Sequence, residues 1–132
     1  MIDHLTLRVA DYDRSKKFFA EALAPLGYEK IMEFEGFCGL GAGGKPDFWI
    51  ARSEEGARPQ THIAFAARTR QDVDRFHEAA VKAGGKDNGK PGPRKEYHEN
   101  YYGAFVLDPD GHNIEACCHK PENRDASEDH RR

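Results

Sequence analysis

The stretch DPDGHNIEACCH, residues 108–119, predicts a tight turn followed by a β-strand. Pro109 presets its own φ and Gly111 accepts a positive φ, as tight turns require. Residues 101–107 before the turn are rich in aromatic and β-branched residues. After it the residues alternate, with Ile114 on one face and Glu115 on the other. The stretch therefore predicts a β-hairpin whose second strand directs a carboxylate away from its apolar face. Because a carboxylate buried alone is costly, Glu115 requires either solvent or a partner.

The length and composition fit a single domain with no sign of a nucleic-acid or membrane partner. The chain has 132 residues and a formal net charge of −3, which argues against nucleic acid or an anionic membrane as a partner. The sequence contains no apolar run of membrane-spanning length, and its first residues enter a strand pattern without the features of a signal peptide. Three cysteines, two of them adjacent, make a poor disulfide framework and favour a reducing cytoplasm.

A strand followed by a helix occurs twice. Residues 2–9 alternate between apolar and polar, and a helical apolar stripe then runs over 15–26 and ends at Gly27. The same order returns over 61–67 and 73–84. A constant offset of 58 residues relates the two segments without a gap. Their matched pairs are His4/His62, Leu5/Ile63, Leu7/Phe65, Ser15/Val73, Phe18/Phe76, Ala22/Ala80, Leu23/Val81 and Gly27/Gly85.

This register predicts an internal duplication of a βαβββ unit. We expect an α+β fold of two paired βαβββ modules that form a curved mixed sheet around a metal-binding cavity. The expected domain covers residues 1–132, with modules at 1–53 and 59–119 and a poorly ordered polar tail at 120–132. Residues 86–100 show the least regular pattern, and they predict either a lid over a ligand or a solvated loop.

Three side chains combine into a candidate metal site. His4 and His62 occupy the same position of the two repeats, on the non-core face of their strands, and Glu115 lies on the non-core face of the last strand. If the repeats stand side by side and curl, these faces line one concavity. Two imidazoles and a carboxylate can hold a divalent metal and leave positions open for substrate. Taken singly, each histidine is as well explained by an ordinary hydrogen bond.

The strands that begin at His4 and His62, together with residues 108–115, resemble the vicinal oxygen chelate superfamily over residues 1–119. This superfamily includes glyoxalase I, bleomycin-resistance proteins, extradiol dioxygenases and fosfomycin-resistance thiol transferases. The resemblance implies paired βαβββ modules around a metal, with His4, His62 and Glu115 as ligands. It also implies sites that are commonly built between two chains of a dimer.

Trp49 departs from the glyoxalase I pattern. Those enzymes typically carry a fourth ligand, Glu or Gln, at the position that Trp49 occupies here. The departure argues against glyoxalase I activity and leaves the three-ligand pattern of the dioxygenases and the fosfomycin-type transferases. Dioxygenases usually have a longer, doubled chain, and the potassium loop and substrate lysine of the transferases find no match here. Trp49 either walls the pocket or packs in the core.

Several other side chains are candidate contacts to substrate, and a rim salt bridge or simple packing explains each of them as well. A nucleophilic cysteine would additionally need a depressed pKa. The candidates are Thr6, Arg8, Trp49, Arg94, His98, Tyr101 and Cys117. His77, in the second helical stripe, is expected to pack against the sheet, and His112, after the turn glycine, is expected to be exposed. Neither is expected to be a ligand.

The sequence thus predicts a homodimeric enzyme with one divalent metal per site, manganese, iron, nickel or zinc. The metal would polarise a small oxygen-chelating substrate for isomerase or lyase, dioxygenase or thiol-transferase chemistry. A bleomycin-resistance-type protein that sequesters a planar or cationic small molecule without catalysis is the alternative. A relic that keeps the metal for stability is the third possibility.

Overall fold

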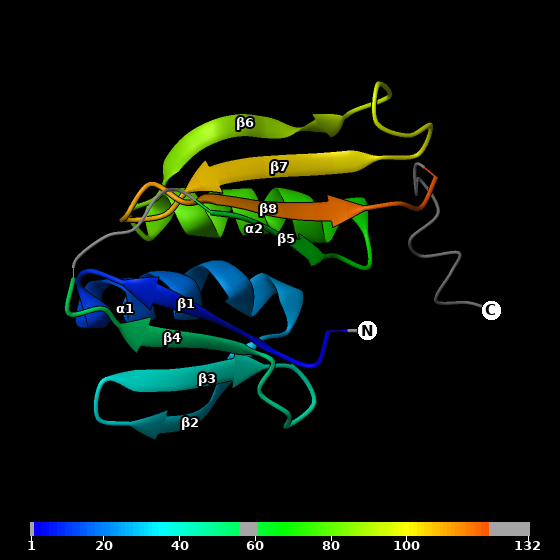
Figure 1. Cartoon of the computed structure of the whole chain (residues 1–132). Coiled ribbons are helices and arrows are strands. Elements are labelled where there is room, and N and C mark those ends of the chain that lie inside the picture. Colours follow the sequence, from blue (N-terminus) through cyan, green and yellow to red (C-terminus); the bar gives the residue numbers. More distant parts are fainter. Residues whose placement is uncertain (1, 56–60, 122–132) are drawn as a thin grey trace.

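Two βαβββ units follow one another along the chain in the computed structural model, which describes residues 2–55 and 61–121 (Figure 1). The first unit contains β1 (Leu5–Val9), α1 (Tyr12–Leu23), the short 3-10 helix η1 (Ala24–Leu26), β2 (Glu29–Phe34), β3 (Phe37–Gly41) and β4 (Phe48–Arg52). The second contains β5 (His62–Ala66), α2 (Arg70–Lys82), β6 (Lys86–Pro93), β7 (Tyr102–Leu107) and β8 (Asn113–Cys118). The predicted tail lies almost wholly outside the described residues, as does most of the predicted seam between the modules.

Each unit forms its own four-stranded mixed sheet. The strand orders are β1-β4-β3-β2 and β5-β8-β7-β6, with β1 parallel to β4 and β5 parallel to β8. The registers also correspond, since Thr6 pairs with Trp49 in the first sheet and Ala64 pairs with Glu115 in the second. The predicted α+β fold of paired βαβββ modules is therefore confirmed. The strands form two sheets rather than one continuous sheet. β1 is the edge strand of the first sheet and β5 is the edge strand of the second.

The alternating pattern of the first strand of each unit places one face against a helix. Leu7 and Val9 of β1, and Ile63 and Phe65 of β5, are buried, while the residues between them are exposed. The two helices pack against each other and join the two halves of the core. The ring centroid of Phe65 lies 5.2 Å from that of Phe48, in edge-to-face contact across the units.

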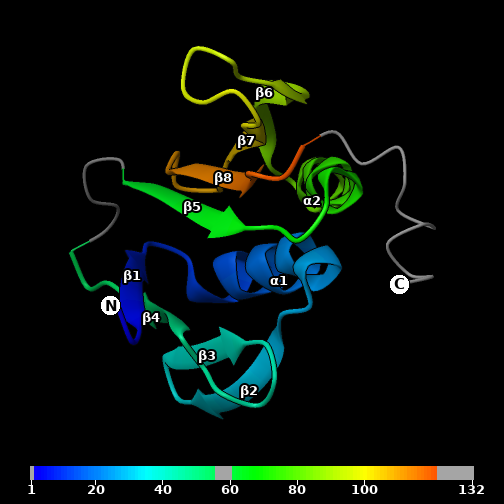
Figure 2. The same ribbon diagram turned by 90° about the vertical axis from the view of Figure 1, so that its right-hand side faces the viewer.

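The non-core face of each sheet lies on its side away from the helices. Figure 2 shows α1 and α2 on the inner side of both sheets, with β1 and β5 as the nearest strands of the two sheets. Side chains on the non-core faces therefore point away from the helices. This orientation decides which of the predicted site residues one chain can bring together.

Side-chain caps fix where both helices begin. Asp11 accepts a hydrogen bond from the backbone N–H of Arg14 at 3.2 Å, and Thr69 accepts one from that of Asp72 at 3.0 Å. The turn at 108–111 forms as predicted, and the Asp110 carboxylate also accepts from the backbone N–H of Ala10 at 3.0 Å. The hairpin of the second unit is thereby tied to the first unit.

Two expectations from the sequence are wrong. Residues 86–93 form the edge strand β6 rather than part of a loop, because register shifts accommodate Gly89 and Gly92 and an edge position tolerates proline. His112 is buried, with 1% of its surface exposed, because its Nδ1 accepts from the backbone N–H of Thr61 at 3.0 Å. His77 packs between α2 and β6 as expected, and its Nε2–H donates to Asp87 Oδ1 at 2.8 Å.

Candidate metal centre and ligand pocket

Glu115 on β8 is the centre of a polar cluster on the outer face of the second sheet. Its side chain is only 2% exposed, yet both carboxylate oxygens have partners. His62 Nε2–H donates to Oε1 at 2.8 Å, and the Tyr101 hydroxyl donates to Oε2. Gly103 on β7 leaves room for this arrangement, because a Cβ there would lie 3.2 Å from Oε2. The carboxylate that the sequence singled out is thus held by two donors.

The Tyr101 hydroxyl and the Cys117 thiol beside Glu115 stay protonated at neutral pH. Burial raises the pKa of the Tyr101 hydroxyl far above its usual range, and the hydrogen bond to Glu115 adds to the effect. Burial also raises the pKa of the Cys117 thiol, whose Sγ lies 3.8 Å from His119 Nε2. Tyr101 therefore acts as a hydrogen-bond donor. The raised pKa of Cys117 gives no support to a nucleophilic role.

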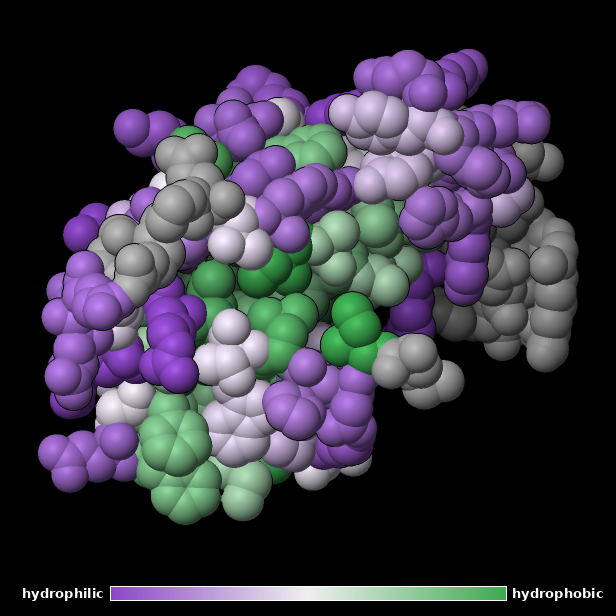
Figure 3. All heavy atoms as spheres, viewed as in Figure 1, coloured by the Kyte–Doolittle hydropathy of each residue, from purple (hydrophilic) through white to green (hydrophobic). Residues whose placement is uncertain are grey.

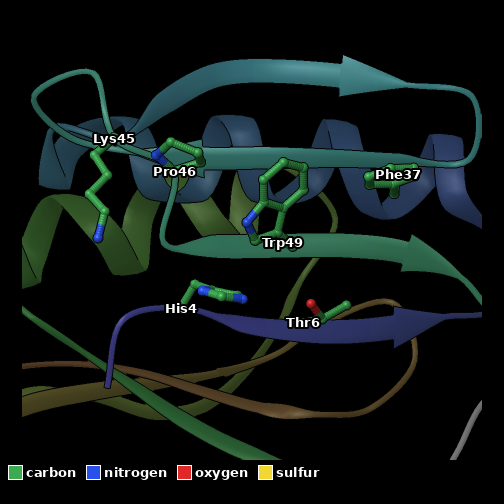
Figure 4. A pocket seen from close by; sticks show the side chains of 6 residues that line it. All are labelled: His4, Thr6, Phe37, Lys45, Pro46 and Trp49. Carbon is green, nitrogen blue, oxygen red and sulfur yellow. The ribbon is translucent and has the colours of Figure 1, made fainter. Parts of the chain in front are cut away.

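His4 lies just before β1, on the outer face of the first sheet (Figure 4). Its Nδ1–H donates to Asp3 Oδ2 at 2.9 Å, an orientation that leaves Nε2 as the ring atom able to ligate. The second oxygen of Asp3 accepts a hydrogen bond from the Lys45 ammonium. The cavity beside His4 has a volume of about 380 Å³. It is lined by His4, Thr6, Phe37, Lys45, Pro46 and Trp49.

One chain brings together two of the three predicted ligands. His62 and Glu115 share a hydrogen bond on the second sheet, whereas His4 lies on the outer face of the first. Within residues 2–55 and 61–121, no group of three or more His, Cys, Asp or Glu side chains is placed to hold a metal ion. His4 therefore does not join His62 and Glu115 within one chain of this structure.

The candidate substrate contacts are distributed over four places. Thr6 borders the His4 cavity and also, with Arg8, a second cleft of about 490 Å³ between β1 and β5. The Arg94 guanidinium donates to the carbonyl oxygen of Lys90 at 2.7 Å and to that of Gly92 at 3.0 Å, so it binds the backbone of its own hairpin. His98 lies near the Glu115 cluster, with its ring centroid 5.8 Å from that of His119.

Sequence reasoning missed the partners that surround these residues. Asp3 precedes His4 directly, and this adjacency was a usable signal for an oriented imidazole. Gly39 and Phe37 beside Trp49 come from the neighbouring strand β3, so only the pairing register reveals them. The contact between His119 and Tyr101, whose ring centroids lie 4.9 Å apart, depends on the path of the chain before β7.

The order of strands and the repeated units agree with the comparisons to known proteins. A model of the Glyoxalase/Bleomycin resistance protein/Dioxygenase superfamily matches residues 1–116. The chain belongs to this superfamily. No curated protein matches the sequence. Among the described residues, no helix is long and apolar enough to cross a membrane.

Solved structures of this superfamily share the fold. A glyoxalase/bleomycin resistance protein from Albidiferax ferrireducens T118 is 27% identical, with a TM-score of 0.74 over 89% of this chain and 97% of that one. A glyoxalase/bleomycin resistance protein/dioxygenase family enzyme from Burkholderia phytofirmans PsJN is 17% identical, with a TM-score of 0.71 over 90% and 98%. A lactoylglutathione lyase from Agrobacterium tumefaciens is 17% identical, with a TM-score of 0.68 over 89% and 92%. At 17% identity the likeness is one of fold alone.

Proposed function

We propose that the protein is a metal-dependent enzyme that works as a homodimer on a small oxygen-chelating substrate. His4 of one copy would join His62 and Glu115 of a second copy around one divalent ion, manganese, iron, nickel or zinc. When bound, the ion would act as a Lewis acid on a substrate oxygen. The observation that carries the proposal is the pair of prepared half-sites on outward-turned faces, His62–Glu115 on one sheet and Asp3–His4 on the other.

The donor set of these half-sites fits a divalent first-row metal. Imidazole and carboxylate are suitable ligands, and a carboxylate that accepts from the remote ring nitrogen is a common second partner of a ligating histidine. Asp3 supplies that partner for His4 at 2.9 Å. In the second half-site, the two atoms that would ligate the ion, His62 Nε2 and Glu115 Oε1, are the two that share a hydrogen bond.

The reaction class is narrower than the superfamily as a whole. Trp49 pairs with Thr6 as Glu115 pairs with Ala64, so Trp49 stands where glyoxalase I enzymes carry a further ligand. A tryptophan cannot ligate the ion, and we therefore favour the three-ligand chemistries, dioxygenase or thiol transferase, over a lactoylglutathione lyase. A fosfomycin susceptibility assay of cells that express the protein tests the thiol-transferase branch.

The metal content of purified protein tests the proposal. We expect about one divalent metal per chain in the wild type, measured by elemental mass spectrometry, and its loss in Glu115→Ala. A wild-type protein that stays metal-free after reconstitution with manganese, iron, nickel and zinc would sink the metalloenzyme.

Mixing two inactive variants tests whether the site spans two copies. His4→Ala and Glu115→Ala each lack one ligand, but a mixed dimer has one complete site. Unfolding and refolding the two together should restore about a quarter of the wild-type sites, since half of the dimers are mixed and each has one intact site of two. A mixture that binds no more metal than either variant alone would contradict a shared site.

A sequestering protein of the bleomycin-resistance type is the second candidate. The observation that favours it is the satisfied state of Glu115, whose two oxygens have protein donors without any metal. This candidate predicts a dimer that binds a small molecule with equal affinity before and after treatment with a chelator. The metalloenzyme predicts that chelation abolishes turnover.

A further inference from the structure

We infer that His112 is a positioning residue for His62. Its imidazole holds the backbone directly before His62 and thereby fixes the place of this candidate metal ligand. The inference rests on the proposed function, in which His62 and Glu115 ligate the ion. It adds a residue that acts on the site through another residue, without touching the ion or the substrate.

The residues at the start of the last strand hold both backbone groups of Thr61, which directly precedes β5. The N–H of Thr61 donates to His112 Nδ1 at 3.0 Å. The carbonyl oxygen of Thr61 accepts from the backbone N–H of Asn113 at 2.8 Å. His62 is the first residue of β5, so the backbone is held one residue before the candidate ligand.

His112 is itself firmly placed. It is 1% exposed, its backbone N–H donates to Asp108 Oδ1 at 2.8 Å, and its carbonyl oxygen accepts from the N–H of Asp108 at 2.9 Å. Because Nδ1 accepts a hydrogen bond, the proton of the neutral ring is on Nε2. A side chain locked by burial and by its own backbone bonds can hold another residue in place. The turn at 108–111 thus presents an acceptor to Thr61.

The other edge of β5 gives His62 little support. β5 is an edge strand, and a cleft of about 490 Å³ between β1 and β5 is lined by Thr61, His62 and His112 among others. Figure 3 shows hydrophobic side chains gathered between the two halves of the molecule, over these strands. The His62 side chain is 54% exposed and reaches Glu115 through a single hydrogen bond. The end of an edge strand opens easily, so loss of the bond to His112 should displace His62 from Glu115.

The first unit orients its histidine by different means. By the strand registers, Pro46 stands in the first unit where His112 stands in the second. The side chain of proline has no hydrogen-bond acceptor. In that unit the carboxylate of Asp3 instead accepts directly from the His4 ring, at 2.9 Å. His4 is thus oriented through its ring, whereas His62 is oriented through its backbone.

Hydrogen exchange of the Thr61 amide, followed by NMR in the metal-free protein, measures this hold directly. His112→Leu removes the acceptor, and exchange should become about five to ten times faster, as loss of one hydrogen bond predicts. His112→Asn places an amide oxygen at the position of Nδ1 and should restore slow exchange. His77→Leu is the matched control, because it removes a histidine of the same unit that bonds Asp87 instead.

Calorimetric zinc titration tests the consequence for the site. We expect His112→Leu to bind zinc about tenfold more weakly than the wild type, and His112→Asn to stay within about threefold. His77→Leu should bind zinc as the wild type does. If His112→Leu does not fold, Thr61→Pro removes the same hydrogen bond from the donor side, before an edge strand, where proline is tolerated.

Three results would overturn the inference. These are unchanged exchange of the Thr61 amide in His112→Leu, wild-type zinc affinity in that variant, and equal losses in His112→Leu and His112→Asn. The last would make the ring itself, rather than its acceptor, the requirement. A wild type that binds no metal would overturn the proposed function as well. Loss of zinc in Glu115→Ala with full binding in His112→Leu would overturn this inference alone.

Discussion

Trp49 and Glu115 occupy the same position in the two halves of the molecule and create opposite surroundings. On the first sheet the large ring is on β4 and faces a glycine, Gly39, on β3. On the second sheet the carboxylate is on β8 and faces an aromatic residue, Phe105, on β7. Duplication thus conserved the backbone register while the outer faces diverged, one toward ring stacking and the other toward a buried carboxylate. The comparison shows that a repeated core constrains the path of a strand far more than it constrains the side chains on the strand's outer face.

The inner faces, in contrast, form one common core. A substitution in this core should have the largest effect on the free energy of unfolding. Phe48→Ala should lower the free energy of unfolding by about 3–5 kcal/mol, because a fully buried ring in contact with Phe19 and Phe65 is lost. Phe34→Ala, on the exposed outer face, should cost less than about 1 kcal/mol. Urea titration checks both. If only the first module of Phe48→Ala unfolded, the two modules would not share one cooperative core, which would contradict our interpretation.

On the second sheet, the neighbouring residues Tyr101 and Tyr102 test how far the buried Glu115 depends on its hydrogen-bond donors. Tyr101→Phe removes a donor from the buried Glu115 and should cost about 1.5–3 kcal/mol, the range for a hydrogen bond to a charged group. Tyr102→Phe is the matched control, because its hydroxyl donates to the exposed Asp74 carboxylate at 2.6 Å. We expect the control to cost about 0.5–1.5 kcal/mol. Equal losses in thermal unfolding would show that Glu115 does not depend on Tyr101.

On the first sheet, the orientation of the His4 ring can be changed without substituting His4 itself. Asp3→Ala removes the carboxylate that holds His4 Nδ1, and it should weaken metal binding about 10–100-fold, as for other partners of ligating histidines. Lys45→Gln removes the ion pair to Asp3 and keeps the contact to His4, so its metal affinity should match the wild type. Calorimetric zinc titration distinguishes the variants. An unchanged affinity in Asp3→Ala would exclude His4 as an oriented ligand.

The smallest expected effect concerns the contacts between each helix and its edge strand. Hydrogen bonds from Lys16, Lys30 and Tyr12 lower the pKa of Glu33 to about 2, and those from His77 and Gly89 lower the pKa of Asp87 to about 2. A carboxyl with a depressed folded-state pKa stabilises the fold above its unfolded pKa, and this contribution is lost as the pH falls toward 2.

Asp87→Asn and Glu33→Gln should therefore each lower the urea midpoint at neutral pH. Both differences from the wild type should shrink between the usual carboxyl pKa of about 4 and pH 2. Urea midpoints of the variants and the wild type, measured from neutral pH down to pH 2, test this expectation. Differences that persist at the acid end would assign these contacts to packing instead of charge.

The elements of the fold could largely be predicted from the sequence, since apolar alternation and the helical stripes depend on neighbours in the chain. The exceptions are instructive. Residues 86–93 lack a strand pattern because an edge strand with bulges has few packing demands. His112 was expected to be exposed. Its burial depends on a hydrogen bond from the backbone N–H of Thr61, which directly precedes β5, the strand parallel to β8. The error at His112 thus arose where a distant segment of the chain sets the environment.

By itself the sequence determined the duplicated βαβββ units and the strand faces on which His4, His62 and Glu115 lie. Only the tertiary structure decided that His62 and Glu115 meet while His4 lies apart, and that Glu115 already has two donors. The physical reason is that periodicity reports which side of a strand a residue occupies. The direction in which that side faces depends on how the two helices pack between the sheets, a contact between residues far apart in the chain.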